Sequence, residues 1–395
     1  MEKYSVVIAG GGPAGICAAI SARRKGEEVV ICEKMPLLGK KILATGNGRC
    51  NLINESLDSS YYNPAARDLV ESVLTRFGKE QTVRFFQSLG LEMYSKMGRI
   101  FPVTNQASSV LKVLEMELAR LAIPVEYNFD FSGLAFSKSG ISVFSKSGKT
   151  IECRRIVLAG GGMAVPAVGA DGSMYEIVRK LGHNIVTPVP AAVPLVVANK
   201  VCHLLQGQRI SAGARSVVDG KPGKVFEGEL LFTKYGLSGT CILDISRDIS
   251  VALNRENRRG TFVVLDLVPF MNRDTLKREL GYRLKKRPAP EEVLVGILPN
   301  KLCTAFKHLF ESGNPGNAAD ILKDIRFKVS ATRGWNEAEY SAGGVDVNEI
   351  EPATLESKIK SKVYFAGEIL DVDGQRGGYN LGWAWASGFI AGLAD

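Results

Sequence analysis

Three glycines and one glutamate near the N-terminus have the types and spacing of a nucleotide-binding site. Gly10, Gly12 and Gly15 form G-x-G-x-x-G, and Glu33 follows 18 residues after Gly15. In this pattern the first glycine permits a tight turn, the second lets the backbone approach a pyrophosphate, and the third lets a helix pack closely. An acid at the end of the next strand accepts hydrogen bonds from ribose hydroxyls. The motif predicts a dinucleotide site and does not choose between FAD and NAD.

The apolar pattern indicates the elements that position these residues. Residues 5–9 and 29–32 are short apolar runs typical of strands buried on both faces, and residues 13–25 have helical spacing. The helix would begin directly after the glycines and direct free N–H groups at phosphates.

A glycine-rich stretch follows at residues 39–54. Its Gly and Asn content predicts a shaped loop with several positive-φ positions rather than a helix. Lys40, Lys41 and Arg49 offer positive charge along a cofactor. A purely structural loop explains the composition equally well, and the residues alone leave both interpretations open.

A second glycine cluster, Gly160 to Gly162, follows an apolar strand at 156–159. No acid stands at ribose distance beyond it, so it is interpreted as backbone lying close to the same cofactor.

The C-terminal stretch favours FAD. A buried strand at 362–368 ends in Gly367-Glu368, and Gly377-Gly378 precede a helix expected to start near Asn380. In flavoproteins with two-segment FAD domains an acid after such a strand bonds the ribityl chain. The helix N-terminus that follows stabilises negative charge on the flavin ring.

These patterns predict an α/β fold: a Rossmann-like two-segment FAD-binding domain with an inserted antiparallel sheet or antiparallel β-barrel domain that carries a helical subdomain. The barrel strands are expected at 193–198, 214–218, 225–233, 240–245 and 261–268. The predicted boundaries are 1–188 and 339–395 for the FAD domain, 189–269 and 325–338 for the barrel, and 270–324 for the helices.

Composition excludes several classes of protein. The chain has 395 residues, 45% of them hydrophobic, and no apolar run approaches the ~18 residues of a membrane span. The first strand begins too early for a signal peptide, so a cytoplasmic protein with no membrane association is expected. Seven scattered cysteines without C-x-x-C and three histidines argue against a disulfide framework and a metal site.

The positive charge is concentrated in one segment. Residues 270–328 hold 12 Lys/Arg and 7 Asp/Glu, which contributes +5 of the net +9. Its densest part is Arg283, Lys285, Lys286 and Arg287. A solvated helix face and a surface for an anionic substrate such as RNA both remain open.

Five segments together resemble the BaiN/RdsA family of NAD(P)/FAD-dependent oxidoreductases, labelled in part as aminoacetone oxidase-type flavoproteins. They are GGGPAG (10–15), GKKILATGNGRCN (39–51), AGGVDV (342–347), YFAGEILDVDG (364–374) and GGYNLGWAWASG (377–388). FTKYGLSG (232–239) resembles the family's loop facing the flavin, although Gly239-Thr240 stands where Gly-Pro is frequent. The resemblance covers essentially the whole chain and implies the fold described above.

The resemblance implies FAD as cofactor but not one substrate, because family members are assigned as reductases of ring C=C bonds in bile-acid intermediates and ribosomal RNA, and as amine oxidases. The preferred hypothesis is a reductase in which NAD(P)H, lacking a second fingerprint, visits the flavin transiently. The alternatives are an amine oxidase using oxygen and a non-catalytic flavin-containing RNA-binding protein. The oligomeric state is left open.

Proton delivery needs a general acid, for which Cys50, Tyr235 and Arg376 are candidates; loop packing or cofactor contact explains each equally well. The residues predicted to bind the cofactor are Gly10, Gly12, Pro13, Ala14, Gly15, Glu33, Lys34, Lys41, Gly46, Asn47, Gly48, Arg49, Cys50, Asn51, Ala159, Gly160, Gly161, Gly367, Glu368, Gly378, Tyr379, Asn380 and Leu381.

Overall fold

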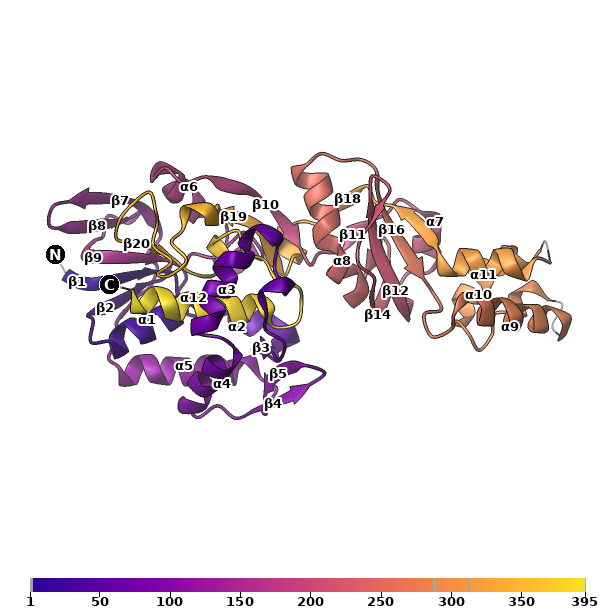
Figure 1. The fold of residues 1–395 in the computed structure, drawn as a ribbon, viewed down its shortest axis with the longest axis horizontal. Coiled ribbons are helices and arrows are strands. Elements are labelled where there is room, and N and C mark those ends of the chain that lie inside the picture. The colour runs from indigo at the N-terminus through magenta and orange to yellow at the C-terminus, as the bar shows by residue number, and fades with distance from the viewer. Residues whose placement is uncertain (1–2, 287–288, 312, 395) are drawn as a thin grey trace. The chain divides into compact units, whose positions relative to one another are not determined.

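A computed structural model describes residues 3–286, 289–311 and 313–394. The chain forms two compact units, which are described separately. The first unit comprises Met1–Pro188 and Tyr340–Asp395, and the second comprises Val189–Glu339. Figure 1 shows the elements of both units with their labels.

The first unit is built on a sheet in the order β6-β2-β1-β9-β8-β7, with β20 also paired to β9. The pairs among β6, β2, β1, β9 and β20 are parallel, and β7, β8 and β9 form an antiparallel meander. The strands are β1 (Lys3–Ala9), β2 (Val29–Cys32), β6 (Val125–Glu126), β7 (Phe131–Ser137), β8 (Gly140–Ser145), β9 (Thr150–Leu158) and β20 (Val363–Phe365). This confirms the predicted Rossmann-like α/β fold.

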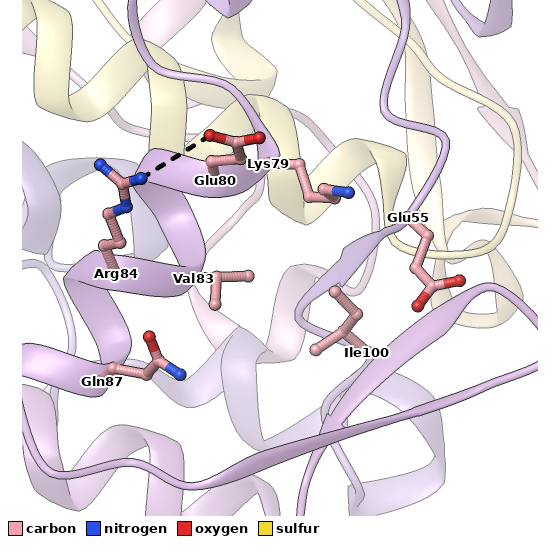
Figure 2. A pocket seen from close by; sticks show the side chains of 7 residues that line it. All are labelled: Glu55, Lys79, Glu80, Val83, Arg84, Gln87 and Ile100. Carbon is pink, nitrogen blue, oxygen red and sulfur yellow. Dashed lines mark ion pairs between the residues drawn. The ribbon is translucent and has the colours of Figure 1, made fainter.

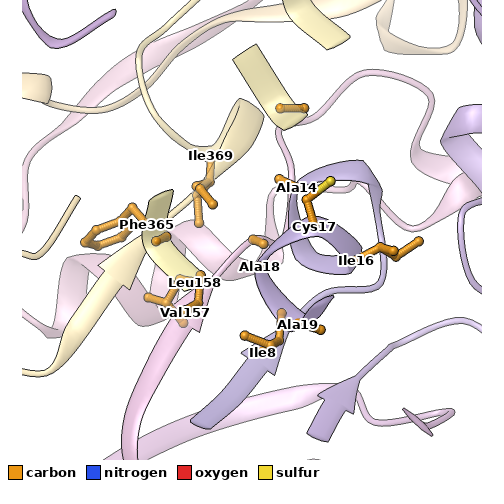
Figure 3. Close-up of a cluster of buried hydrophobic side chains, with 14 of the residues drawn as sticks. Ile8, Ala14, Ile16, Cys17, Ala18, Ala19, Val157, Leu158, Phe365 and Ile369 are labelled. Atoms are coloured by element: carbon orange, nitrogen blue, oxygen red, sulfur yellow. The ribbon is translucent and has the colours of Figure 1, made fainter. Parts of the chain in front are cut away.

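Two helices from opposite ends of the chain pack against each other beside this sheet: α1 (Pro13–Arg24) and α12 (Tyr379–Leu393). Small residues allow the close approach, because a side chain at Gly388 would overlap the backbone of Ala14. Figure 3 shows the apolar core between α1 and the strands, where Ile8, Ile16 and Leu158 are fully buried. The buried strands are therefore apolar on both faces, as predicted.

The remaining elements of the first unit surround this core. The helices are α2 (Lys40–Ala44), α3 (Arg67–Arg76), α4 (Lys79–Ser88), α5 (Ala107–Arg120) and α6 (Ser173–Lys180). A small sheet has the order β3-β5-β4, formed by Ile53–Asn54, Arg99–Pro102 and Met93–Lys96. The strands β10 (Ile185–Ala191) and β19 (Tyr340–Val345) also pair.

The second unit contains an antiparallel sheet in the order β17-β16-β12-β14-β15-β11-β18, with β13 paired to β12. Its strands are β11 (Leu195–Val196), β12 (Arg209–Val218), β13 (Lys221–Pro222), β14 (Phe226–Thr233), β15 (Gly236–Ser238), β16 (Thr261–Asp266), β17 (Ile325–Lys328) and β18 (Ala331–Thr332). Its helices are α7 (Lys200–Leu204), α8 (Thr240–Ser250), α9 (Arg273–Lys286), α10 (Asn300–Phe306) and α11 (Pro315–Lys323).

Two predictions about local structure were wrong. The strand expected at 240–245 is the start of α8, whose buried Ile242, Ile245 and Ile249 recur at helical spacing and pack toward β12 and β14. Residues 40–44, expected to be loop, form the short helix α2. In both cases tertiary burial of one face overrides the local β-branched or glycine-rich composition.

Candidate functional site

The three glycines of the N-terminal motif have separate roles. A side chain at Gly15 would overlap the Gly10 carbonyl oxygen, and one at Gly10, which has φ of 113°, would meet the Ala159 carbonyl. A side chain at Gly12 would meet nothing within 4 Å. Gly10 and Gly15 are therefore required by packing, whereas Gly12 leaves open space at the start of α1, where a pyrophosphate would approach.

Glu33 directly follows β2 and holds the glycine turn in place. Its Oε2 accepts a hydrogen bond from the Gly11 N–H at 2.6 Å, and its Oε1 accepts one from the Met35 N–H at 2.7 Å. Burial raises the pKa of Glu33, and the backbone N–H donors oppose that increase. The adjacent Lys34 pairs with Asp171 at 2.5 Å. The acid thus lies beside the glycine turn, where the motif predicted it.

The glycine-rich loop contains several residues in the left-handed region of backbone conformation. Gly46, Asn47, Gly48 and Cys50 all have positive φ, as predicted for this stretch. Residues 46–49 are exposed. Nearby, the buried Oδ1 of Asn51 has no hydrogen-bond partner within the described chain. A strained, exposed loop with an orphaned buried acceptor fits a segment that a ligand covers.

The N- and C-terminal segments meet at an ion pair between Lys41 and Glu368. The second carboxylate oxygen of Glu368 accepts a hydrogen bond from the Ser341 N–H at 2.8 Å. Gly367 precedes this acid with φ of 78°, and a side chain there would crowd Ala14. Two residues predicted separately to bind the cofactor are therefore brought together.

The second glycine cluster is also packed close to the first. The Ala159 N–H donates to the Ala9 carbonyl at 2.9 Å, which carries the chain alongside the first glycine turn. Gly160 packs against Met174, and Gly161 has φ of 74°. The cluster contributes backbone to the same region as Gly10.

Helix α12 begins against the N-terminal segment. A side chain at Gly378 would lie 2.5 Å from the Ile53 carbonyl carbon. Asn380 bonds both the N–H and the carbonyl of Gly374 at 2.9 Å, and Leu381 is half-buried. The first N–H groups of an α-helix have no intrahelical acceptor, so this end presents donors and a partial positive charge.

A supporting segment at residues 54–63 was missed by the sequence analysis. Asn63 donates to the Asp371 carbonyl at 3.1 Å and accepts from the Asp373 N–H at 3.0 Å. The Tyr61 ring stacks on Tyr379 with centroids 4.6 Å apart. These contacts brace the loop that precedes α12. Because partners are more than 300 residues apart, no local pattern could have revealed them.

The three candidate acids lie in different settings. Cys50 is fully buried, and burial raises the pKa of its thiol to about 12. Arg376 is half-buried in the turn before α12. Tyr235 lies in the second unit, between β14 and β15, where the Arg333 guanidinium carbon stands 4.7 Å from its ring. Their roles as proton donors stay predictions.

The residues present fit FAD. Glu33 would hold the ribose, Gly12 the pyrophosphate, and the N-terminus of α12 the flavin ring, while Asn51 supplies an unsatisfied acceptor. Among the described residues, no three His, Cys, Asp or Glu side chains are grouped so that they could hold a metal ion. In the same part of the chain, none of the helices is long and apolar enough to span a membrane.

The chain matches known proteins over nearly its whole length. Residues 4–394 match the family model described as the HI0933-like protein Rossmann domain. The chain is 38% identical to the 3-dehydro-bile acid delta(4,6)-reductase of Clostridium scindens, covering 100% of this chain and 99% of that protein. It is 29% identical to the ribosomal RNA dihydrouridine synthase of Escherichia coli over 98% of this chain and 96% of that one.

Among solved structures, the fold is similar to that of the 3-ketosteroid-delta4-(5alpha)-dehydrogenase of Rhodococcus jostii. The TM-score is 0.55 at 13% identity, with 100% of this chain and 96% of that chain covered. This likeness shows the fold alone. Taken with the full-length family match, it leads to one conclusion: the chain belongs to the HI0933-like, or BaiN/RdsA, family and is an FAD-dependent oxidoreductase.

Proposed function

We propose that the protein is an NAD(P)H-driven reductase of an electron-poor ring C=C bond. The observation that carries the proposal is the full-length match, at 38% identity, to a reductase of an unsaturated 3-oxo steroid acid. Dihydrouridine is likewise uridine with its ring C=C bond reduced, so the second relative is named for the same class of reaction. FAD, when bound, supplies the hydride transfer.

The chain's own residues bind and orient. The N-terminus of α12 would stabilise negative charge on the bound flavin ring. Asn63 braces the loop that leads into this helix. The second carbon of the bond needs a proton from a group within hydrogen-bond reach. Tyr235 and Arg376 are the more accessible candidates, since Cys50 is fully buried.

The test begins with the flavin absorbance of the holoprotein mixed with NADH or NADPH without oxygen. Bleaching by either nucleotide, followed by recovery on adding a 3-oxo-Δ4 bile acid or a ribosomal RNA fragment, is the expected result. Absence of bleaching with both nucleotides, together with bleaching by an amine and peroxide formation in air, would establish the oxidase instead.

Uridine in ribosomal RNA is retained as a candidate substrate because Lys285 and Lys286 are exposed at the end of α9. Lys286 stands 4.6 Å from the centre of the exposed Tyr282 ring. Basic side chains beside an exposed aromatic ring suit an RNA strand. Arg287 lies outside the described residues.

Substituting Lys285 and Lys286 with glutamate should weaken RNA binding and flatten its salt dependence, while leaving the reduction of a bile acid unchanged. Salt-sensitive RNA binding without any turnover would favour the non-catalytic binding protein.

A further inference from the structure

The β3-β5-β4 sheet carries a polar row on one face. Its register places Asn54 opposite Arg99 and Arg99 opposite Lys96. Residues directly opposite each other in antiparallel strands project from the same face. Two residues further along, Phe101 and Tyr94 share that face, with ring centroids 5.9 Å apart.

Among the described residues, the cations of this row have no acidic partner. Lys96 and Arg99 are exposed, and neither forms an ion pair with any carboxylate of the described chain. Arg49 adds a third cation, because its guanidinium carbon lies 5.8 Å from the centre of the Phe101 ring. Arg49 donates to the Gly46 carbonyl at 3.3 Å. Like charges directly opposite each other are unfavourable, so an anion bound here would stabilise the hairpin.

The opposite face of the same sheet is different. Ile100, which alternates with Arg99, lines a groove together with Val83 of α4. Figure 2 shows this groove, where Arg84 forms an ion pair with Glu80 at 3.8 Å and Glu55 stands across from α4. The groove carries both signs of charge. Among the described residues, the Arg99 face therefore differs in presenting cations without carboxylates beside them in the row.

This basic face adjoins the segments expected to line the flavin. A side chain at Gly377 would lie 3.4 Å from Arg99 Nε, so Arg99 rests against the loop that precedes α12. The Asn54 side chain donates to the Gly377 carbonyl at 2.9 Å. Arg49 itself belongs to the glycine-rich loop. Arg99 and Asn54 therefore lie beside the loop before α12, whose N-terminus is expected to face the flavin ring.

We propose that Arg49, Lys96 and Arg99 form a binding site for an oxyanion of the acceptor substrate, a carboxylate or a phosphate, and so anchor the ring to be reduced. Guanidinium groups match these anions with two parallel hydrogen bonds. Phe101 and Tyr94 provide apolar contact beside the charge. The inference rests on the proposed reductase function and deepens it.

The test measures equilibrium binding to the oxidised holoprotein through the change in flavin absorbance. The probes are a 3-oxo-Δ4 bile acid and its methyl ester, and a short oligouridylate and uridine. We expect Arg99→Met and Lys96→Met each to weaken binding of a charged probe about tenfold, with the uncharged member of that pair unaffected. The charged probe that responds identifies the source of the oxyanion. Lys138→Met, an exposed lysine on the β7–β8 turn, is the matched control.

Arg99→Lys should recover part of the affinity, and FAD content and melting temperature verify that each variant is folded. Equal losses for the ester, or unchanged binding of both charged probes, would overturn the site. If the variants bind the acceptor probes normally but need more NADPH to reduce the flavin, the cations bind the electron donor NADPH. That result would overturn their role in binding the acceptor substrate. Arg99-dependent binding of a probe that is never reduced would support the anion site and refute the proposed reductase.

Discussion

The glycine motif at 10–15 and the basic cluster on α9 are both local patterns in the sequence, but their residues have different roles in the structure. Gly10 and Gly15 occupy positions where any side chain would strike backbone. In the basic cluster Arg283 is largely buried, donating to Glu279 and to the Val295 carbonyl, both at 2.6 Å. Of the described members of the cluster, Lys285 and Lys286 are exposed. Glycine spacing is dictated by the backbone, whereas a run of charge does not reveal which member is structural.

The largest effect is expected within the glycine motif itself. Gly15→Ala places a methyl group on the Gly10 carbonyl and should lower the free energy of unfolding by about 3 kcal/mol, with loss of bound FAD. Gly12→Ala is the matched control, because its space is open and its φ is −81°. Gly12→Ala should change the stability of the FAD-free protein by less than about 0.5 kcal/mol and weaken FAD about tenfold.

Urea unfolding of the FAD-free protein and titration with FAD separate the two outcomes. If both variants unfold alike, the distinction between a packing glycine and a phosphate-facing glycine is wrong.

A second pair of variants dissects the basic cluster. Arg283→Met removes the ion pair with Glu279 and hydrogen bonds to two carbonyls, and should destabilise the second unit by about 2 kcal/mol. Lys285→Met, which is exposed, should change stability by less than about 0.5 kcal/mol. Urea unfolding of the full chain provides the measurement. If Arg283→Met leaves the free energy of unfolding unchanged, Arg283 is not structural and becomes a candidate for RNA binding.

Asn63 extends the comparison to a residue that no motif marked. Asn63→Ala removes both bonds to the 371–373 segment and should cost about 1–2 kcal/mol. If the brace positions α12 relative to the flavin, the reduction potential of the bound flavin should also shift. A stability loss with an unchanged potential would limit Asn63 to a structural role.

Cys50 provides the smallest and most specific test. Because burial raises its pKa from 9.0 to about 12, the folded protein keeps the thiol protonated where the unfolded chain ionises it. The resulting stability is present below pH 9 and is lost as the pH rises toward 12. Between pH 8 and pH 10 the wild type should therefore lose about 1 kcal/mol more than Cys50→Ala. If the free energies of unfolding of the wild type and Cys50→Ala, measured with urea, fall equally with pH, the buried environment assigned to the Cys50 thiol is wrong.

Features that depend on local sequence patterns could be predicted, whereas features that depend on tertiary burial or strand pairing could not. The βαβ start and the helix after Gly378 were predicted correctly, because apolar periodicity and glycine spacing are local signals. The prediction at 240–245 was wrong, since Ile242 and Ile245 suit a strand as well as a buried helix. The cations opposite each other on β4 and β5 gave no signal, because strand register is set by pairing.

The sequence by itself determined the Rossmann-like fold and a dinucleotide site, since these depend on where glycine is sterically required and where apolar runs recur. The acid Glu368 and the helix expected after Gly378 then favoured FAD. Only the tertiary structure decided that Lys41 pairs with Glu368, that Asn63 braces the loop before α12, and that Arg99 faces Gly377. Each of these contacts joins residues more than 270 positions apart. Such partners are chosen by packing of the whole first unit, which no local pattern encodes.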